Sequence, residues 1–403
     1  MVGTTQSTTR LWSRNFILLF TARTVSVLGD QMLVPIAITV AVLQAGYGVT
    51  GVGFALAANT APLAVFVIFG GVVVDRFTPV RVMITADIAR LIIHGILAIS
   101  FLAGKPSLWL IVSLLALSGT AMAAFQPGYV SVIRRTTHEV QKANAALRVS
   151  ESLVTVLGPA LSGLLLALSS VWTVVAIDAV TYLVSAVCLF ALRLRIPRSQ
   201  ERPTLRHDLV QGWQEFTART WLWGVIVIFM LYQVTVNGPF LTLGQSLILI
   251  EHGESTLGFV MAMYGVGAVL GGLMAARVKP QHPLRAGAIA LAGNACSVLA
   301  VALYLPAPAI ATGYALHGAG SAFWLVMFHS SVQTKIPPET LGRVHAYDVA
   351  GSVVMRPVGQ IVAGPASLAI GAATVLFFSS AMLFVTVGLL LAVPAIRNLR
   401  RTD

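Results

Sequence analysis

Residues 49–81 read VTGVGFALAANTAPLAVFVIFGGVVVDRFTPVR, an uncharged run through Val74 that is followed by three charges in seven residues. As a helix, residues 49–74 would be about 39 Å long, which exceeds the ~30 Å hydrocarbon core of a bilayer. The charges behind the run mark the point where such a helix would meet water. We therefore interpret this stretch as a membrane-spanning helix and the beginning of its polar loop.

The rest of the chain repeats this pattern. Its 403 residues are 57% hydrophobic and 10% charged, whereas soluble proteins carry about 25% charged residues. The predicted spans are 16–43, 49–74, 82–103, 108–131, 149–170, 171–193, 221–248, 255–276, 284–305, 308–331, 345–370 and 373–394. The sequence thus predicts an all-α membrane protein with twelve transmembrane helices.

The net charge of +12 raises the question of a nucleic-acid partner, which the placement of the charges answers. With the N-terminus in the cytoplasm, Lys105 is the one basic residue assigned to an outer loop, and three arginines fall inside spans. The remaining basic residues lie on the cytoplasmic side, as the positive-inside rule requires. We expect a multi-pass protein of the cell (inner) membrane with both termini cytoplasmic and no nucleic-acid partner.

The two halves of the chain resemble each other. Matching positions are Gly70-Gly71 with Gly271-Gly272, Leu117-Ser118-Gly119 with Leu316-His317-Gly318, Glu139 with Glu339, and Pro159 with Pro357. These matches predict two six-helix bundles, residues 1–193 and 221–403, joined by a cytoplasmic linker at 194–220. Many secondary transporters are built from such repeats, with the substrate site between them.

The loop after the second span carries Gly70, Gly71, Asp75, Arg76 and Arg81. This arrangement resembles the cytoplasmic loop motif of the major facilitator superfamily. The resemblance implies a gating motif, in which Asp75 latches the two halves with Arg134 or Arg135 as partner. The alternative is that Arg76 and Arg81 serve only as topology charges.

Further short segments resemble the branch of that superfamily containing siderophore exporters and macrolide-efflux proteins. They are VLGDQ at 27–31, ADIAR at 86–90, KANA at 142–145, IDA at 177–179 and ETLGR at 339–343. The resemblance implies two pseudo-symmetric six-helix bundles and alternating access for a small organic substrate. We expect a monomer in the lipid bilayer, driven by a proton gradient and needing no cofactor.

Two departures from the antiporter pattern stand out. Gly158, Pro159 and Gly163 look like an antiporter kink motif, but its upstream glycines are missing. Residues 108–131 contain no basic side chain, so the arginine that many proton antiporters use in the fourth helix is absent. If protons drive transport, they take another route.

Charges inside a bilayer are expensive and mark candidate functional sites. Asp30 lies about 21 Å along the first span from Phe16, on the same face as Arg23. It is a candidate proton site, or else a structural partner of an arginine on a neighbouring helix. Arg356 is predicted to neutralise Asp30 across the halves, to bind an anionic substrate group, or to bond a helix carbonyl freed by Pro357.

The other polar residues of the spans receive more modest predictions. Asp87 and Arg90 are expected to form an internal pair, and Asp178 is expected to have a structural role. His317 either titrates or is simply hydrogen-bonded. Asp348 has no assigned role. The expected cavity lining is Asn59, Gln126, Tyr232, Gln233, Asn237 and Trp324. This mixture suits an amphipathic or aromatic organic molecule.

The sequence does not predict an enzyme, because it lacks a phosphate-binding loop, a nucleophile elbow and a His/Cys cluster with metal-ligand spacing. Cys188 and Cys296 lie in separate spans and suggest no metal site. We predict a proton-coupled exporter of a drug-like, antibiotic or siderophore-like compound. The alternatives are an importer or uniporter, a lipid flippase and a non-transporting membrane sensor.

Overall fold

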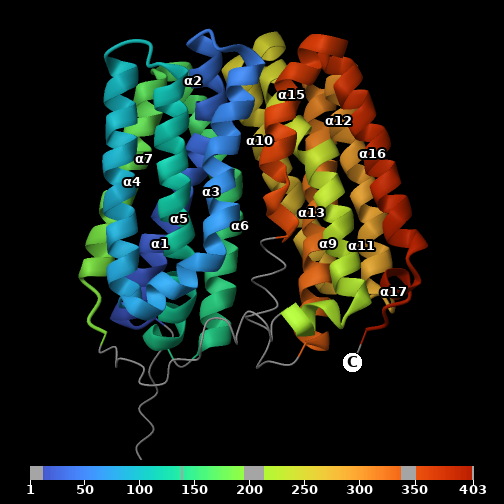
Figure 1. Ribbon diagram of the computed structural model, residues 1–403, viewed down its shortest axis with the longest axis horizontal. Coiled ribbons are helices and arrows are strands. Elements are labelled where there is room, and N and C mark those ends of the chain that lie inside the picture. The colour runs from blue at the N-terminus through green and yellow to red at the C-terminus, as the bar shows by residue number, and fades with distance from the viewer. Residues whose placement is uncertain (1–11, 138, 195–212, 337–350, 402–403) are drawn as a thin grey trace, which may run out of the picture.

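A computed structural model describes residues 12–137, 139–194, 213–336 and 351–401 of the chain. In these ranges every regular element is a helix, and the helices run side by side in two bundles (Figure 1). The predicted linker at 194–220 and the ETLGR segment fall largely or wholly outside the described residues.

The first bundle contains six membrane-length helices. They are α1 (Arg14–Met32) continued by the π-helix η1 (Leu33–Ala37) and α2 (Ile38–Gln44), then α3 (Gly48–Arg76), α4 (Pro79–Leu102), α5 (Leu108–Thr136), α6 (Val140–Leu168) and α7 (Val171–Phe190). Ser13 and Ser107 cap α1 and α5, because each hydroxyl accepts a hydrogen bond from a backbone N–H of the first turn.

The second bundle repeats this order with more irregular backbone. Its elements are α9 (Thr220–Tyr232), η2 (Gln233–Asn237), η3 (Phe240–Gly244), α10 (Gln245–Arg277), α11 (Pro283–Leu291), η4 (Ala292–Asn294), α12 (Ala295–Ala302), α13 (Ala307–Lys335), α15 (Arg356–Ile370), α16 (Ala372–Ala392) and α17 (Pro394–Arg397). Gly253, at φ 81°, breaks α10 between the seventh and eighth spans. Nine stretches of the described chain are long and apolar enough to span a membrane, and the longest of them, Thr220–Arg277, holds two spans that meet at Gly253. This arrangement is consistent with the twelve predicted spans.

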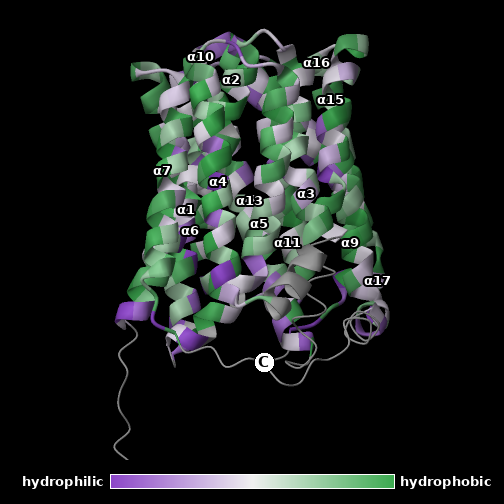
Figure 2. Cartoon of the chain, turned by 60° about the vertical axis from the view of Figure 1, so that its left-hand side comes forward, coloured by the Kyte–Doolittle hydropathy of each residue, from purple (hydrophilic) through white to green (hydrophobic). Residues whose placement is uncertain are grey.

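The outer surface of both bundles is apolar. Trp109, Phe190 and Leu368 are 79%, 83% and 82% exposed. Exposure of so many apolar side chains to water is unfavourable, whereas lipid is a favourable environment for them. Figure 2 shows hydrophobic residues covering the sides of the molecule, with hydrophilic residues gathered mainly at its two ends. The structure is that of a multi-pass membrane protein.

The two bundles touch near one end, which we call the closed end. There α3 packs against α15 and α6 against α10. The Thr39 hydroxyl donates to Gln245 Oε1 at 3.2 Å, and Gln44 Nε2 donates to Glu254 Oε1 at 2.7 Å. The C-terminus lies at the opposite end (Figure 1).

Glycines allow the backbones to meet at the closed end. A Cβ on Gly163 would lie 2.7 Å from the Cα of Gly258 across the interface. A Cβ on Gly53 would collide with the carbonyl of Gln360, and one on Gly364 with Thr50. Because these residues flank the turns at the closed end, the halves are held together there by direct helix-to-helix packing.

Candidate transport site

The main polar feature of the first bundle joins α1, α4 and α7. Arg90 on α4 forms an ion pair with Asp30 on α1. The Tyr182 hydroxyl on α7 donates to the same Asp30 oxygen at 2.8 Å, and the Arg90 guanidinium lies 4.0 Å from the centre of the Tyr182 ring. Arg90 is 3% exposed and the Asp30 side chain 18%. Asp30 therefore has an arginine partner on a neighbouring helix, which was one of the two predicted alternatives.

The predicted Asp87–Arg90 pair is wrong in its partner. Arg90 turns toward Asp30, and Asp87 instead accepts a hydrogen bond from the Ser185 hydroxyl on α7 at 2.6 Å. The spacing placed Asp87 and Arg90 on one face of the helix correctly. It could not show that the guanidinium would reach across to another helix.

A second buried group adjoins the first. His94 Nδ1 bonds Asp178 on α7, and His94 Nε2 bonds the Ser118 hydroxyl on α5 at 2.8 Å. The imidazole also packs edge-on against Tyr182, with ring centres 5.2 Å apart. His94 was not predicted as a site residue, although its position seven residues after Asp87 places it on the same face of α4.

These side chains form a carboxylate cluster, defined as Asp30, Asp87, Asp178, Arg90 and His94. Three carboxyl groups meet one guanidinium and one imidazole, so full ionisation of the acids would leave the cluster negative even with His94 charged. Burying uncompensated charge is costly. The acids of the cluster thus outnumber its basic groups, and the cluster is the main group of acidic side chains described inside the first bundle.

Arg23 belongs to a different group. Its Nε donates to Glu151 on α6 at 3.0 Å, and its guanidinium lies 4.6 Å from the centre of the Tyr129 ring. Although Arg23 and Asp30 share a face of α1, they bond different helices. Arg23 thus ties α1 to α6.

Arg356 stands at the start of α15 in the second bundle. No hydrogen bond or ion pair involves its guanidinium within the described ranges, and its Nε is buried without a partner. Its electrostatic neighbours are the phenol groups of Tyr232 and Tyr264. Pairing of Arg356 with Asp30, one of the predicted alternatives, is not seen in this structure, where Asp30 pairs with Arg90.

His317 on α13 is buried and bonded through Nδ1 to the Ser297 hydroxyl on α12 at 2.7 Å. Its ring stacks on Phe240, with centres 5.4 Å apart. The arrangement repeats the His94–Ser118 bond of the first bundle with the two residue types exchanged, since Ser118 and His317 are equivalent positions. His317 therefore has the hydrogen-bonding environment that was one of its predicted alternatives.

The predicted cavity residues divide into two kinds. Trp324 stacks on Phe229 and Phe328, and Tyr232 packs beside Val236 and Leu383, so both belong to the core of the second bundle. This placement corrects the expectation that Trp324 faces the space between the halves, whereas the Tyr232 hydroxyl lies near Arg356. The larger apolar area of a bundle core is the more favourable environment for their rings.

The remaining cavity candidates stay partly polar. Gln233 Nε2 donates to the Ser352 carbonyl at 2.5 Å, which links the seventh span to the eleventh. Within the seventh span, Asn237 Nδ2 donates to Gln233 Oε1 at 2.6 Å. Asn59 and Gln126 are half-buried. Their role in substrate binding stays a prediction.

The kink motif contributes packing surfaces on both sides of α6. Gly158 faces Gln31 of α1, and Gly163 faces Gly258 of α10. Pro159 lies within the helix between them. The motif therefore places α6 between the first span and the second bundle.

The loop motif can be followed only in part. Gly70, Gly71, Asp75 and Arg76 lie in α3, and Arg81 is exposed in the first turn of α4. The side chains of residues 67–76 and of Arg134 fall outside the described part of the structure, so the latch stays a prediction.

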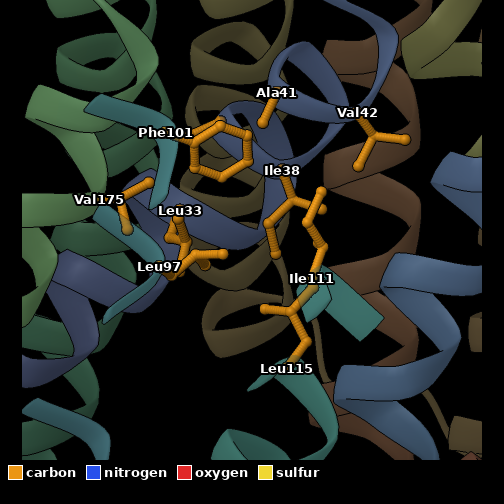
Figure 3. Close-up of a pocket in the computed structure, with 10 residues that line it drawn as sticks. Leu33, Ile38, Ala41, Val42, Leu97, Phe101, Ile111, Leu115 and Val175 are labelled. Carbon is orange, nitrogen blue, oxygen red and sulfur yellow. The ribbon is translucent and has the colours of Figure 1, made fainter. Parts of the chain in front are cut away.

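Figure 3 shows an apolar cavity between α4, α5, α7 and the first span. It is lined by Leu33, Ala37, Ile38, Ala41, Val42, Leu97, Phe101, Ile111, Leu115 and Val175. Hydrocarbon alone surrounds it, so it offers no bond to a proton or a polar group. Across the described chain, no group of three or more His, Cys, Asp or Glu side chains is arranged to hold a metal ion.

Comparison with known proteins identifies the family. The profile of the Major Facilitator Superfamily matches residues 19–355, and the chain belongs to that family. It is a membrane transporter rather than an enzyme.

Two curated relatives extend over most of the chain. The uncharacterised MFS-type transporter YvqJ of Bacillus subtilis (strain 168) is 25% identical over 379 residues, covering 91% of this chain and 89% of the relative. The enterobactin exporter EntS of Escherichia coli (strain K12) is 24% identical over 406 residues, covering 96% and 94%.

Solved structures share the fold. A mutant of the nucleoside transporter NupG superposes with a TM-score of 0.72 at 10% identity, covering 93% of this chain and 98% of the other. A bacterial homolog of the human lysosomal transporter Spinster, in an inward-facing and unoccupied conformation, superposes with a TM-score of 0.70 at 13% identity, covering 96% and 98%.

Proposed function

We propose that this chain is a proton-coupled exporter of an amphipathic organic compound, located in the cytoplasmic (inner) membrane with both termini in the cytoplasm. The observation that carries the proposal is the carboxylate cluster, in which three acids share one guanidinium and one imidazole. The proposed direction of transport rests on the similarity to the enterobactin exporter and on the resemblance of the motifs.

Asp30 is the proposed entry point for the proton, because it is the most exposed acid of the cluster. Its side chain is 18% exposed, whereas Asp178 and Asp87 are fully buried. Protonation would convert its ion pair with Arg90 into a weaker contact with a neutral carboxyl group. The interaction between α4 and α1 would then be weaker.

The first span connects this event with the closed end. The span continues from Asp30 through the π-helix η1 to Thr39 and Gln44, which bond the second bundle. Irregular π-turns inside helices often occur at functional sites. Movement of α1 relative to α4 therefore has a direct route to the contacts that keep the closed end shut.

The test uses everted membrane vesicles and the fluorescent dyes ethidium and Hoechst 33342. Uptake by the wild type should stop when a protonophore is added. Asp30→Asn should abolish gradient-driven uptake. The matched control Glu139→Gln, which alters a surface carboxylate paired with Lys142 at 2.9 Å, should leave it unchanged.

Three results would count against the proposal. Uptake that ignores the protonophore would exclude proton coupling. Gradient-driven uptake by Asp30→Asn would exclude Asp30 as the coupling residue. Dye efflux from everted vesicles would indicate import.

A further inference from the structure

The two bundles differ in whether the arginines within their membrane spans have a carboxylate partner. Arg23 is paired with Glu151 and Arg90 with Asp30, so each buried cation of the first bundle has a carboxylate partner. Arg356 has neither an ion pair nor a hydrogen bond among the described residues, and its Nε is buried. A guanidinium without a counter-charge in this environment is unfavourable.

The side chain remains reachable. Arg356 as a whole is only partly buried, so its guanidinium has an accessible part as well as a buried nitrogen. It lies 14 residues before Ile370, the end of α15, which corresponds to about 21 Å along a helix. Asp30 lies equally far before Gln44, the end of α2, so the two residues occupy similar depths in opposite bundles.

Polar neighbours surround Arg356 without neutralising it. The phenols of Tyr232 and Tyr264 act on it electrostatically, and both are neutral hydrogen-bonding groups. One turn further along α15, the side-chain oxygen of Gln360 is also buried and lacks a partner in the described chain. Among the described residues, the second bundle thus presents a cation without a counter-charge near one unpartnered side-chain oxygen, whereas Arg23 and Arg90 of the first bundle are paired.

We propose that Arg356 binds an anionic group, such as a carboxylate, on the transported compound. A guanidinium can hold a carboxylate through two parallel hydrogen bonds, which an ammonium group cannot do. The substrate supplies the counter-charge that the described residues do not give Arg356, while Asp30 remains available to Arg90 and protons. This inference deepens the proposed transport function, because it assigns the substrate class to organic anions with an apolar body.

The binding test uses purified full-length protein in detergent and two probes that differ in one charge, dansylglycine and its methyl ester. The wild type should bind the carboxylate at least about 10-fold more tightly than the ester. Arg356→Gln should abolish this preference, and Arg356→Lys should restore only part of it. The control Arg148→Gln changes an arginine with an 80% exposed side chain and should keep the preference.

Because no proton gradient is present, this experiment separates the proposed site from proton coupling. Asp30→Asn should keep the preference for the carboxylate even if it abolishes transport. Displacement of dansylglycine by phosphatidylglycerol but not by soluble carboxylates would assign the site to lipid and overturn the inference. A wild type that binds both probes equally would also overturn it.

A second measurement requires no ligand. If the protein itself offers Arg356 no counter-charge, Arg356→Met should raise the melting temperature of the empty transporter by about 2 °C or more. A lower melting temperature for Arg356→Met would mean that the protein supplies the partner, and the inference would fall. If neither probe binds, the melting temperature of Arg356→Met decides whether the inference holds.

Discussion

The contact between Gly163 and Gly258 predicts how the closed end responds to one added methyl group. A Cβ on Gly258 would lie 2.8 Å from the Cα of Gly163, whereas ordinary contact begins at 3.4 Å. Gly258→Ala must therefore separate the helices by about 0.6 Å or distort them. Overpacking of this kind costs about 1–3 kcal/mol, and the cost applies only while the closed end is shut.

This energy corresponds to a shift of about 5- to 150-fold in the equilibrium between the two states of the closed end, away from the shut state and toward the open one. The assay labels a cysteine introduced at Thr39, which is fully buried beside Gln245 in the shut form. Cys188 and Cys296 are first replaced by alanine. The rate of maleimide labelling in detergent should rise by a similar factor in Gly258→Ala, because labelling requires opening.

The matched control is Gly272→Ala on the same helix, where an added Cβ meets nothing within 4 Å. It should label at the parent rate. If Gly258→Ala elutes as folded protein and labels no faster than Gly272→Ala, the close glycine contact does not hold the closed end shut, and the reasoning is refuted.

Two further variants test the interior. His94→Ala leaves Asp178 and Ser118 buried without their partner, and we expect it to destabilise the protein by about 3–5 kcal/mol; an unchanged melting temperature would contradict the observed hydrogen bonds. Trp324→Ala removes the stack on Phe229 and should cost about 3–5 kcal/mol while preserving the relative affinities for different dyes; a change in dye selectivity with unchanged stability would return Trp324 to the substrate cavity.

Pairing between helices was predicted less well than the helices themselves. The spacing of Asp87 and Arg90 was correct for one face of α4, yet Arg90 bonds Asp30, which lies 60 residues earlier in the chain. His94 was overlooked because a single histidine in an apolar span carries no pattern. Only the approach of α5 and α7 gives it two bonding partners.

Aromatic residues illustrate the same limit. Trp324 and Tyr232 are amphipathic, so their types suit both a substrate cavity and a bundle core. The choice depends on how far each helix is rotated about its axis, and rotation is decided by packing against neighbours. In the structure that rotation directs Trp324 toward Phe229 and Phe328.

The amino-acid sequence alone determined the twelve spans, the two-bundle architecture and the family. Transfer of a helix into a bilayer depends on the sum of its own residues, and that sum can be read locally. The tertiary structure decided which charges are neutralised: Asp30 receives Arg90, Arg23 receives Glu151, and Arg356 receives no partner in the described chain. Electrostatic pairing depends on distances of a few ångströms between helices remote in sequence, and only the packed bundles establish those distances.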